Sequence, residues 1–255
     1  LDAVGIDQRE LTSVTANSPG QDFGPQLAAR RFTDLAVHRV PSHHLAHAYT
    51  AWWPSGFQDA LVLVVDATGS TDENDRTESY SLYRGDTEKL ELIHAEKVEA
   101  TLTGVGTLGM LYEEVTRRIG FISHLENGLS HAEAGKTMGL APYGGESRVF
   151  SQWIYAQEGS YSLDIPGYDI LLEIEALEKR YENIEGKLWM RPHLVELAAK
   201  VQQELEEALL HLVREAKRET QLNRLCLAGG VALNSVANHR LVRELELDGF
   251  FAFPA

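Results

Sequence analysis

Hydrophobic residues follow one another without interruption in Leu61-Val62-Leu63-Val64-Val65, and a single carboxylate, Asp66, comes directly after them. An unbroken apolar run of this length is typical of a strand that is buried on both faces. Two later segments, 79–84 and 90–93, instead alternate between polar and apolar residues, with Gly85-Asp86 between them. This alternation predicts two further strands joined as a hairpin.

Two segments carry the three-to-four-residue period of amphipathic helices. In the first, 104–120, the apolar residues lie on one stripe and Gly120 provides the stop signal. The stripe consists of Leu108, Leu111, Tyr112, Val115 and Ile119. A longer helix is predicted from near Pro192 to about Glu219, with Glu and Lys between its apolar residues. We interpret the stripe of this longer helix as a surface that faces the core.

The last part of the chain changes again from strand to helix. Residues 223–228 predict a short buried strand, Gly229-Gly230 interrupts it, and a helix is predicted from Val231. The glycines permit close approach of a ligand and a helix N-terminus offers free N–H groups, which suits a phosphate or a nucleotide. The predicted order of elements is strands, helices, strand, helix and strand, which is typical of the α/β class.

Chain length, net charge and cysteine content limit the classes of fold and function that this chain can have. The chain has 255 residues, enough for one large domain or two moderate ones. Its formal net charge of −15 argues against a nucleic-acid-binding surface. The single cysteine, Cys226, excludes a disulfide framework and is interpreted as a buried small apolar residue.

Targeting signals are weak or absent in the sequence. No apolar stretch approaches the length of a membrane-spanning helix, and the first residues do not resemble a signal peptide. We therefore expect a protein of the reducing cytoplasm that does not bind a membrane. The chain does not begin with Met and ends at Pro254-Ala255 as though a strand were entering a loop, so we interpret it as a piece of a longer protein.

The richest candidate chemistry lies in the segment Ser42-His43-His44-Leu45-Ala46-His47. If Ser42 caps a helix, His43 and His47 lie one turn apart on one face, a spacing at which two imidazoles can hold one metal ion. A strand that delivers Asp66 at its C-terminal end would add a carboxylate, and two histidines with one carboxylate suit Fe²⁺ or a similar ion. The alternative interpretation is that the histidines are surface or capping residues and that Asp66 belongs to a turn.

Two other stretches are candidates for binding a phosphate. Gly69 and Ser70 follow the buried strand in a loop of small hydroxyl residues, which can expose backbone N–H groups or can form an ordinary polar loop. Residues 133–145 contain several glycines and a proline and predict a backbone-constrained loop. Lys136 in this loop either supplies a point charge for a phosphate or carboxylate or is simply solvated.

Three motifs, in this order, resemble the amino-terminal domain of the O-carbamoyltransferase family of nodulation and antibiotic-tailoring enzymes. The motifs are His43-His44-Leu45-Ala46-His47 with Val64-Val65-Asp66, then Lys136-Thr137-Met138-Gly139-Leu140-Ala141-Pro142-Tyr143-Gly144, then Gly229-Gly230-Val231-Ala232-Leu233-Asn234. The family domain is similar to the threonylcarbamoyl-adenosine synthesis protein. The resemblance extends from about residue 35 to the end, and the three motifs together are far more specific than any one of them.

The resemblance implies a reaction. The family joins carbamoyl phosphate and ATP into carbamoyl adenylate and passes the carbamoyl group to a hydroxyl of a small-molecule acceptor, as in natural-product or nodulation-factor biosynthesis. The domain seen here would hold the adenylate and perform the transfer, and the adenylate itself would be made by a separate C-terminal domain. A homodimer is a possible assembly.

The resemblance also implies roles for individual residues. The family's iron would be held by His43, His47 and Asp66. The residues expected to face the adenine nucleotide are Gly229, Gly230 and Asn234, and Lys136 is expected to lie close to the site as a catalytic residue. Apart from the resemblance, the hypothesised transfer mechanism makes the neighbouring His44 a candidate general base.

The fold implied by the resemblance is an actin/Hsp70/sugar-kinase-like α/β fold, incomplete at both ends. Its two lobes would be 1–145 and 190–255, with a peripheral insertion at 146–190. A short loop of the His-Asp-Ser-Ala type is missing at the start, and the chain stops before a further Asp ligand and before the adenylate-forming domain. The metal site is therefore expected to have three ligands at most from this chain.

Three other functions fit parts of the pattern. A tRNA threonylcarbamoyl transferase shares the superfamily, but the acidic charge and the motif 136–144 argue against it. A nucleotide-binding module would bind ATP without turnover. A metallohydrolase would use the two histidines and Asp66 without any nucleotide.

Overall fold

The computed structural model describes residues 11–17, 23–99, 105–125, 128–145, 150–181 and 191–253. Within these residues, five strands form one mixed sheet in the order β11-β10-β3-β4-β5. The strands are β3 (Ala60–Val65), β4 (Arg76–Gly85), β5 (Leu90–Glu99), β10 (Arg224–Ala228) and β11 (Gly249–Ala252). β10 pairs in parallel with both β3 and β11, whereas β3, β4 and β5 form an antiparallel meander. The predicted buried strand and the hairpin at Gly85-Asp86 are thus confirmed.

β3 is the centre of the fold because both of its faces are covered. All six of its residues are buried, and successive side chains point to opposite faces. Leu61, Leu63 and Val65 pack in the larger core cluster, and the alternate residues of β3 pack in the smaller one. Helix α2 (His43–Ser55) covers the smaller-cluster face through Ala48, Ala51 and Trp52, so this helix is fixed directly on the strand that ends at Asp66.

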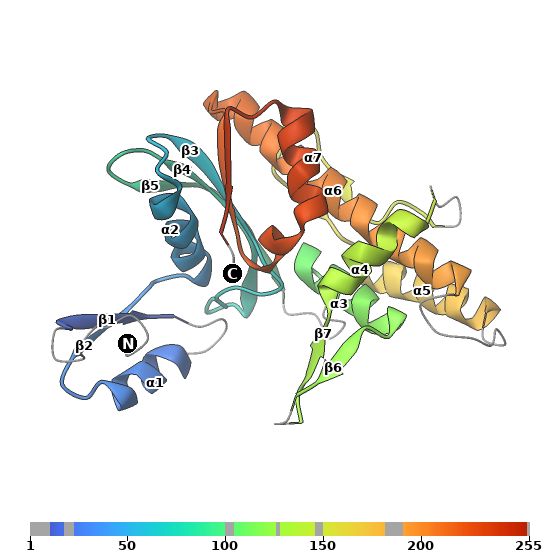
Figure 1. Cartoon of the computed structure of the whole chain (residues 1–255), viewed down its shortest axis with the longest axis horizontal. Helices are drawn as coiled ribbons and strands as arrows, with labels where there is room; N and C mark the ends of the chain where they lie inside the picture. The colour runs from blue at the N-terminus through green and yellow to red at the C-terminus, as the bar shows by residue number, and fades with distance from the viewer. Residues whose placement is uncertain are drawn as a thin grey trace.

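The opposite face of the sheet is covered by the two predicted amphipathic helices (Figure 1). These are α3 (Leu108–Ile119) and α6 (Pro192–Thr220), and both contribute to the larger core cluster. All five residues of the predicted α3 stripe are buried, and the helix ends at Gly120 in the left-handed conformation. Helix α7 (Ser235–Leu245) packs beside α6 on the same side of the sheet. Although α6 is long, none of the described helices has both the length and the apolar character needed to cross a bilayer.

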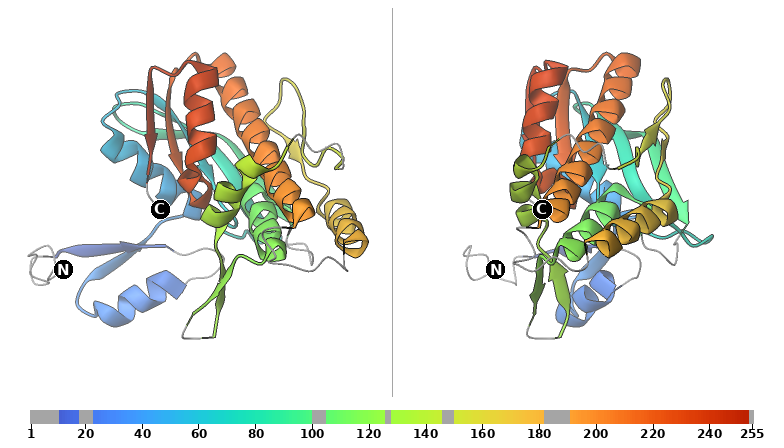
Figure 2. Two further views of the ribbon diagram at one scale, coloured as in Figure 1. Left: turned by 45° about the vertical axis from the view of Figure 1, so that its right-hand side comes forward. Right: turned by 90° about the vertical axis from the view of Figure 1, so that its right-hand side faces the viewer.

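The N-terminal part forms a small unit of its own below α2 (Figures 1 and 2). Strands β1 (Ser13–Ala16) and β2 (Ala36–Arg39) pair in parallel, and α1 (Phe23–Arg31) connects them. The Asn17 side chain, which follows β1, donates a hydrogen bond to the carbonyl of Val40, 3.1 Å away. This contact fixes the chain directly before the histidine segment.

The prediction of a loop at 133–145 is wrong in its local structure. Residues Ala134–Leu140 form helix α4, and Ala141–Tyr143 form the 3₁₀ turn η3. Gly135 and Gly139 do not break the helix because neither has a positive φ and the space beside each is open. The buried Thr137 hydroxyl donates to that of Thr116 on α3, 2.9 Å away, and this contact anchors the helix.

In the described part of the chain, two further short hairpins lie outside the main sheet. Strands β6 (Ile122–His124) and β7 (Ser130–Ala132) pair in the first, and β8 (Tyr155–Ala156) and β9 (Leu163–Asp164) in the second. The second belongs to the segment 146–190, which we expected at the periphery. In its described part this segment also contains helix α5 (Gly167–Arg180), and it places Trp153 and Ile174 fully buried in the larger core cluster.

Helix α3 begins at a cap that also contacts the loop after β3. The buried Thr107 hydroxyl accepts from the amide of Met110 at 3.1 Å and donates to the carbonyl of Ala67 at 2.7 Å. Replacing Thr107 by Ala should lower the free energy of unfolding by about 1–2 kcal/mol, because both bonds are lost. Thr107→Ser, which keeps the hydroxyl, should retain most of the stability in urea unfolding, and equal losses in the two variants would contradict the assigned cap.

Candidate metal centre

Helix α2 presents the two candidate histidines on the side that faces the end of β3. Ser42 caps the helix as predicted, since its hydroxyl accepts from the amide of Leu45 at 3.0 Å. The helix ends at Gly56 in the left-handed conformation, after Pro54. His43 and His47 are separated by one turn, so their rings lie one above the other on the same face. Both are partly buried, with 16% and 21% of their side chains exposed.

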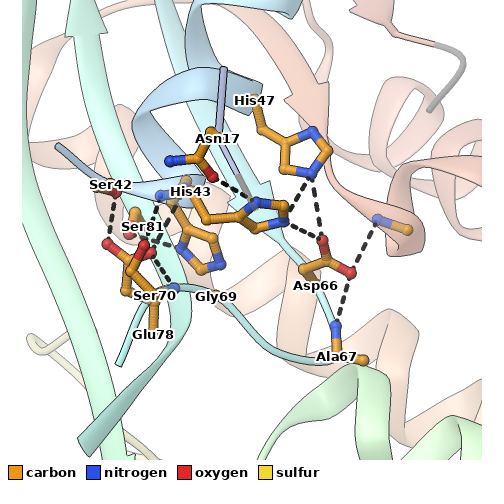
Figure 3. Close-up of polar contacts among 12 residues, drawn as sticks. Asn17, Ser42, His43, His47, Asp66, Ala67, Gly69, Ser70, Glu78 and Ser81 are labelled. Carbon is orange, nitrogen blue, oxygen red and sulfur yellow. Dashed lines mark hydrogen bonds and ion pairs between the residues drawn. The ribbon is translucent and has the colours of Figure 1, made fainter. Parts of the chain in front are cut away.

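Two imidazole nitrogens and one carboxylate oxygen lie close together between α2 and the end of β3 (Figure 3). The Nε2 atoms of His43 and His47 are 3.1 Å apart, and each lies 3.3 Å from Oδ2 of Asp66. Ligand atoms at about 2.0–2.2 Å from one ion are separated by roughly 3.0–3.5 Å in octahedral or tetrahedral geometry. The separations among the three atoms therefore match those of ligands that share one ion.

The residues around this cluster hold its members in orientation. Nδ1 of His43 lies 3.1 Å from Oδ1 of Asn17, and the other oxygen of Asp66, Oδ1, accepts from the amide of Ala67 at 2.8 Å. Such contacts to the outer atoms of ligands fix imidazole and carboxylate orientation in metal sites. Burial raises the pKa of Asp66, but hydrogen bonds from His43, His47 and the Ala67 amide outweigh it and hold that pKa well below its ordinary value. Asp66 is therefore an anion, and this carboxylate together with the two imidazoles suits a divalent cation.

The glycine pair after β10 lies against the same carboxylate. The amide of Gly230 is directed at Oδ1 of Asp66, with 3.4 Å between the two atoms. Gly229 has φ +85°, and a Cβ there would lie 2.3 Å from the carbonyl oxygen of Val65. No residue with a side chain could therefore keep the backbone this close to the end of β3. The pair brings the third sequence motif into contact with the first.

The helix expected from Val231 begins later than predicted. Gly230–Leu233 form a 3₁₀ turn, η5, and α7 begins at Ser235 with Asn234 as its cap. Oδ1 of Asn234 accepts from the amide of Ala237 at 3.0 Å, and its Nδ2 donates to Oε1 of Gln202 at 2.8 Å. The Asn234 side chain is therefore buried between α6 and α7.

A cavity of about 210 Å³ lies beside this amide pair, among α4, η3, α6 and α7. Its lining residues are Met138, Ala141, Pro142, Ala199, Gln202, Gln203, Glu206 and Val236. The cavity is thus lined by Met138, Ala141 and Pro142 of the second motif and by Val236, two residues after the third, and its lining residue Gln202 binds Asn234.

Gly69 and Ser70, expected to offer free N–H groups, use these groups within the fold. The amide of Gly69 donates to the carbonyl of Glu78 at 3.0 Å, and that of Ser70 donates to the Glu78 carboxylate at 2.8 Å. Lys136 lies on α4 with 57% of its side chain exposed, and its ammonium group forms an ion pair with Glu133 at 2.5 Å. In this arrangement Lys136 pairs with its own helix end.

His44 differs from its two neighbours because it points into the protein. Its side chain is fully buried and its Nδ1 lies 2.8 Å from the hydroxyl of Ser81. Among the described residues, its Nε2 has no hydrogen-bond partner. Burial lowers the pKa of His44 to about 4, although the nearby Glu78 carboxylate acts in the opposite direction. His44 is therefore a neutral imidazole at pH 7.

The sequence pattern did not predict that Asn17 and Glu78 would lie beside the cluster of His43, His47 and Asp66. Asn17 precedes the histidine segment by 26 positions and belongs to a different small unit. Glu78 is 5% exposed and lies in β4, where the alternating pattern gives no sign that a carboxylate would face inward.

Comparisons with known proteins agree with this architecture. The family model described as carbamoyltransferase N-terminus matches residues 24–255. Nodulation protein NolNO of Sinorhizobium fredii is 31% identical over 241 residues, which cover 92% of this chain and 31% of that protein. The nodulation protein NolO of Bradyrhizobium diazoefficiens is 30% identical over 223 residues, covering 84% of this chain and 35% of its own. The chain therefore spans about a third of the length of these curated relatives.

A solved structure shares the fold at low identity. Full-length HypF in its phosphate- and nucleotide-bound form superposes with a TM-score of 0.56 at 14% identity, over 89% of this chain and 35% of HypF. This likeness confirms the prediction of a mixed α/β fold.

Proposed function

The chain belongs to the carbamoyltransferase N-terminal family, and from this premise we propose that it transfers a carbamoyl group from carbamoyl adenylate to a hydroxyl of a small-molecule acceptor. The observation that carries the proposal is the meeting of His43, His47, Asp66 and the Gly230 amide at the C-terminal end of β3. Ligand sites of α/β sheets are commonly built at such strand ends. The proposed substrates of the whole enzyme are carbamoyl phosphate, ATP and the acceptor.

His43, His47 and Asp66 would hold a divalent ion such as Fe²⁺, for which two imidazoles and one carboxylate are a suitable ligand set. When bound, the ion supplies a Lewis acid for the carbamoyl carbonyl or the acceptor oxygen. The protein prepares this site by keeping Asp66 ionised and by fixing the His43 ring through Asn17. It thus supplies a preformed ligand set.

The remaining residues position the nucleotide in our proposal. Gly229 and Gly230 bring backbone close to the site, where the Gly230 amide can face the phosphate of the adenylate. The adenine base would enter the cavity beside Asn234, whose wall includes Gln202. Exposed Lys136 would exchange its ion pair with Glu133 for a phosphate charge. Gly69 and Ser70 act on the nucleotide indirectly, by shaping the loop after Asp66.

The transfer itself is an acyl-type substitution. The acceptor oxygen forms a bond to the carbamoyl carbon, the bond from that carbon to the phosphate oxygen breaks, and AMP leaves with the electron pair. The hydroxyl proton passes to solvent. A general base works best with a pKa near the operating pH, so the fully buried His44 with a pKa of about 4 is poorly suited to this role. We assign His44 a supporting role behind the loop at Gly69.

The proposal is tested by supplying the purified protein with carbamoyl adenylate and a panel of hydroxyl acceptors. We expect AMP and carbamoylated acceptor in equal amounts by chromatography and mass spectrometry, and loss of both in His47→Ala. His239→Ala, which changes an exposed histidine on α7, should react like the wild type. Turnover of acceptor esters without nucleotide would instead indicate a metallohydrolase, and tight nucleotide binding without AMP release would indicate a binding module.

A further inference from the structure

The first three amides of α2 each donate to a side chain. The amide of Leu45 uses the local cap Ser42. The amide of His43 donates to the hydroxyl of Ser70 at 2.8 Å, and that of His44 donates to Oε2 of Glu78 at 3.3 Å. Two of the three acceptors therefore come from the segment between β3 and β4 and from β4 itself (Figure 3). Amides at a helix start have no partner within the helix, so these contacts stabilise it.

Glu78 is the residue that connects these contacts. Its carboxylate also accepts from the hydroxyl of Ser42 at 2.5 Å and from the amide of Ser70 at 2.8 Å. Its backbone pairs with the same loop, since its amide donates to the carbonyl of Ser70 at 3.0 Å. The side chain is almost completely buried, and hydrogen bonds to a buried carboxylate are stronger than those between neutral groups.

The charge of Glu78 complements the helix end. The first turn of α2 contains no acidic residue of its own, while a helix N-terminus carries a partial positive charge. Glu78 supplies the missing negative charge from another strand. Gly69 makes the close packing possible, because a Cβ at this position would lie 2.6 Å from Glu78 and 2.9 Å from the His44 ring.

The segment between β3 and β4, which contains Ser70, also contains Asp66. Ser70, which binds the amide of His43, lies four residues after Asp66, and the Asp66 carboxylate lies 3.3 Å from the His43 ring. The two halves of the metal cluster, one on α2 and one after β3, are therefore joined through Ser70 and Glu78. A change in this connection would shift the two imidazoles relative to Asp66.

We propose that Glu78 is a positioning residue of the metal centre: with Ser70 it fixes the N-terminus of α2 to the loop after Asp66, so that His43, His47 and Asp66 face one point. This inference rests on the proposed metal site. It assigns Glu78 no contact with substrate. Removing a partner that is bonded directly to a metal ligand typically changes metal affinity by about 10–100-fold, and we expect the same range for Glu78, which acts through Ser70 and the start of α2.

The test is a titration of the metal-free protein with Co²⁺, followed by the visible absorption of the bound ion. Glu78→Gln keeps the length of the side chain but replaces one acceptor oxygen by a donor. We expect it to bind Co²⁺ about 10–100-fold more weakly than the wild type and with a changed spectrum. Ser70→Ala, which removes only the acceptor of the His43 amide, should shift affinity in the same direction.

The matched control is Glu173→Gln. Glu173 also accepts from a backbone amide, that of Ser151 at 2.7 Å, and from the Trp153 indole at 2.7 Å, on the other side of the sheet. Its variant should lose thermal stability but keep the wild-type Co²⁺ affinity and spectrum. The inference would be overturned if Glu78→Gln bound Co²⁺ with the affinity and spectrum of the wild type. If Glu78→Gln does not fold, the same result in Ser70→Ala would overturn it. If the wild type itself binds no Co²⁺, the proposed metal site fails instead.

Discussion

His47→Ala should weaken binding of a divalent ion by more than about 100-fold, because it removes one of the three proposed ligands. The loss of a contact outside the ligand set usually costs about 10–100-fold, which is less. The fold should survive, since the side chain is partly exposed and Ala is the best helix former. Equilibrium dialysis against Fe²⁺ under anaerobic conditions, with metal content measured by mass spectrometry, gives the affinity of each variant.

His239→Ala serves as the control for that measurement, because it removes an exposed histidine from α7. It should bind the ion like the wild type. Equal metal content in the wild type and in His47→Ala would mean that any bound ion lies elsewhere. A large fall in the thermal midpoint of metal-free His47→Ala would mean that His47 mainly stabilises the fold.

Gly229→Ala should cause the largest loss of stability among single methyl additions to the glycines that line the site. The position has φ +85°, which costs an L-residue roughly 1–2 kcal/mol, and the new Cβ would lie 2.3 Å from the carbonyl oxygen of Val65. Overpacking of this kind adds about 1–3 kcal/mol. Together we expect a loss of about 2–5 kcal/mol in the free energy of unfolding, measured in guanidinium chloride.

Gly139→Ala on α4 is the matched control for this prediction. Its Cβ would meet open space, and Ala is favoured over Gly inside a helix by up to about 1 kcal/mol. Stability should therefore stay the same or rise slightly. A Gly229→Ala variant as stable as the wild type would show that the strand end and the glycine pair are not as close as described.

The sequence pattern predicted the parts of the site that depend on local order. Ser42 and the following histidines have the signature of a capped helix, and the unbroken apolar run before Asp66 is typical of a strand buried on both faces. The two glycines after β10 were expected to permit close approach of a ligand, which stays a prediction, and at Gly229 the structure shows a close approach to the carbonyl of Val65. Each of these features is encoded by neighbours within about one turn or one strand.

Features that depend on distant contacts could not be predicted in this way. Glu78 acts on α2 across 34 to 36 positions, and Asn17 acts on His43 across 26. The glycines of 133–145 suggested a loop, but Gly135 and Gly139 lie in helix α4, which is anchored by the buried contact between Thr137 and the distant Thr116. Likewise, the free amides expected at Gly69 and Ser70 are used by a strand whose position the pattern does not fix.

The proposed carbamoyl transfer depends on one ion shared by His43, His47 and Asp66. The most direct measurement is anomalous X-ray diffraction from crystals of the protein loaded with Fe²⁺, collected on both sides of the iron absorption edge. We predict one peak about 2.0–2.2 Å from Nε2 of both histidines and from Oδ2 of Asp66. A fully loaded crystal with its iron peak at any other position, or with none beside these three atoms, would contradict the account.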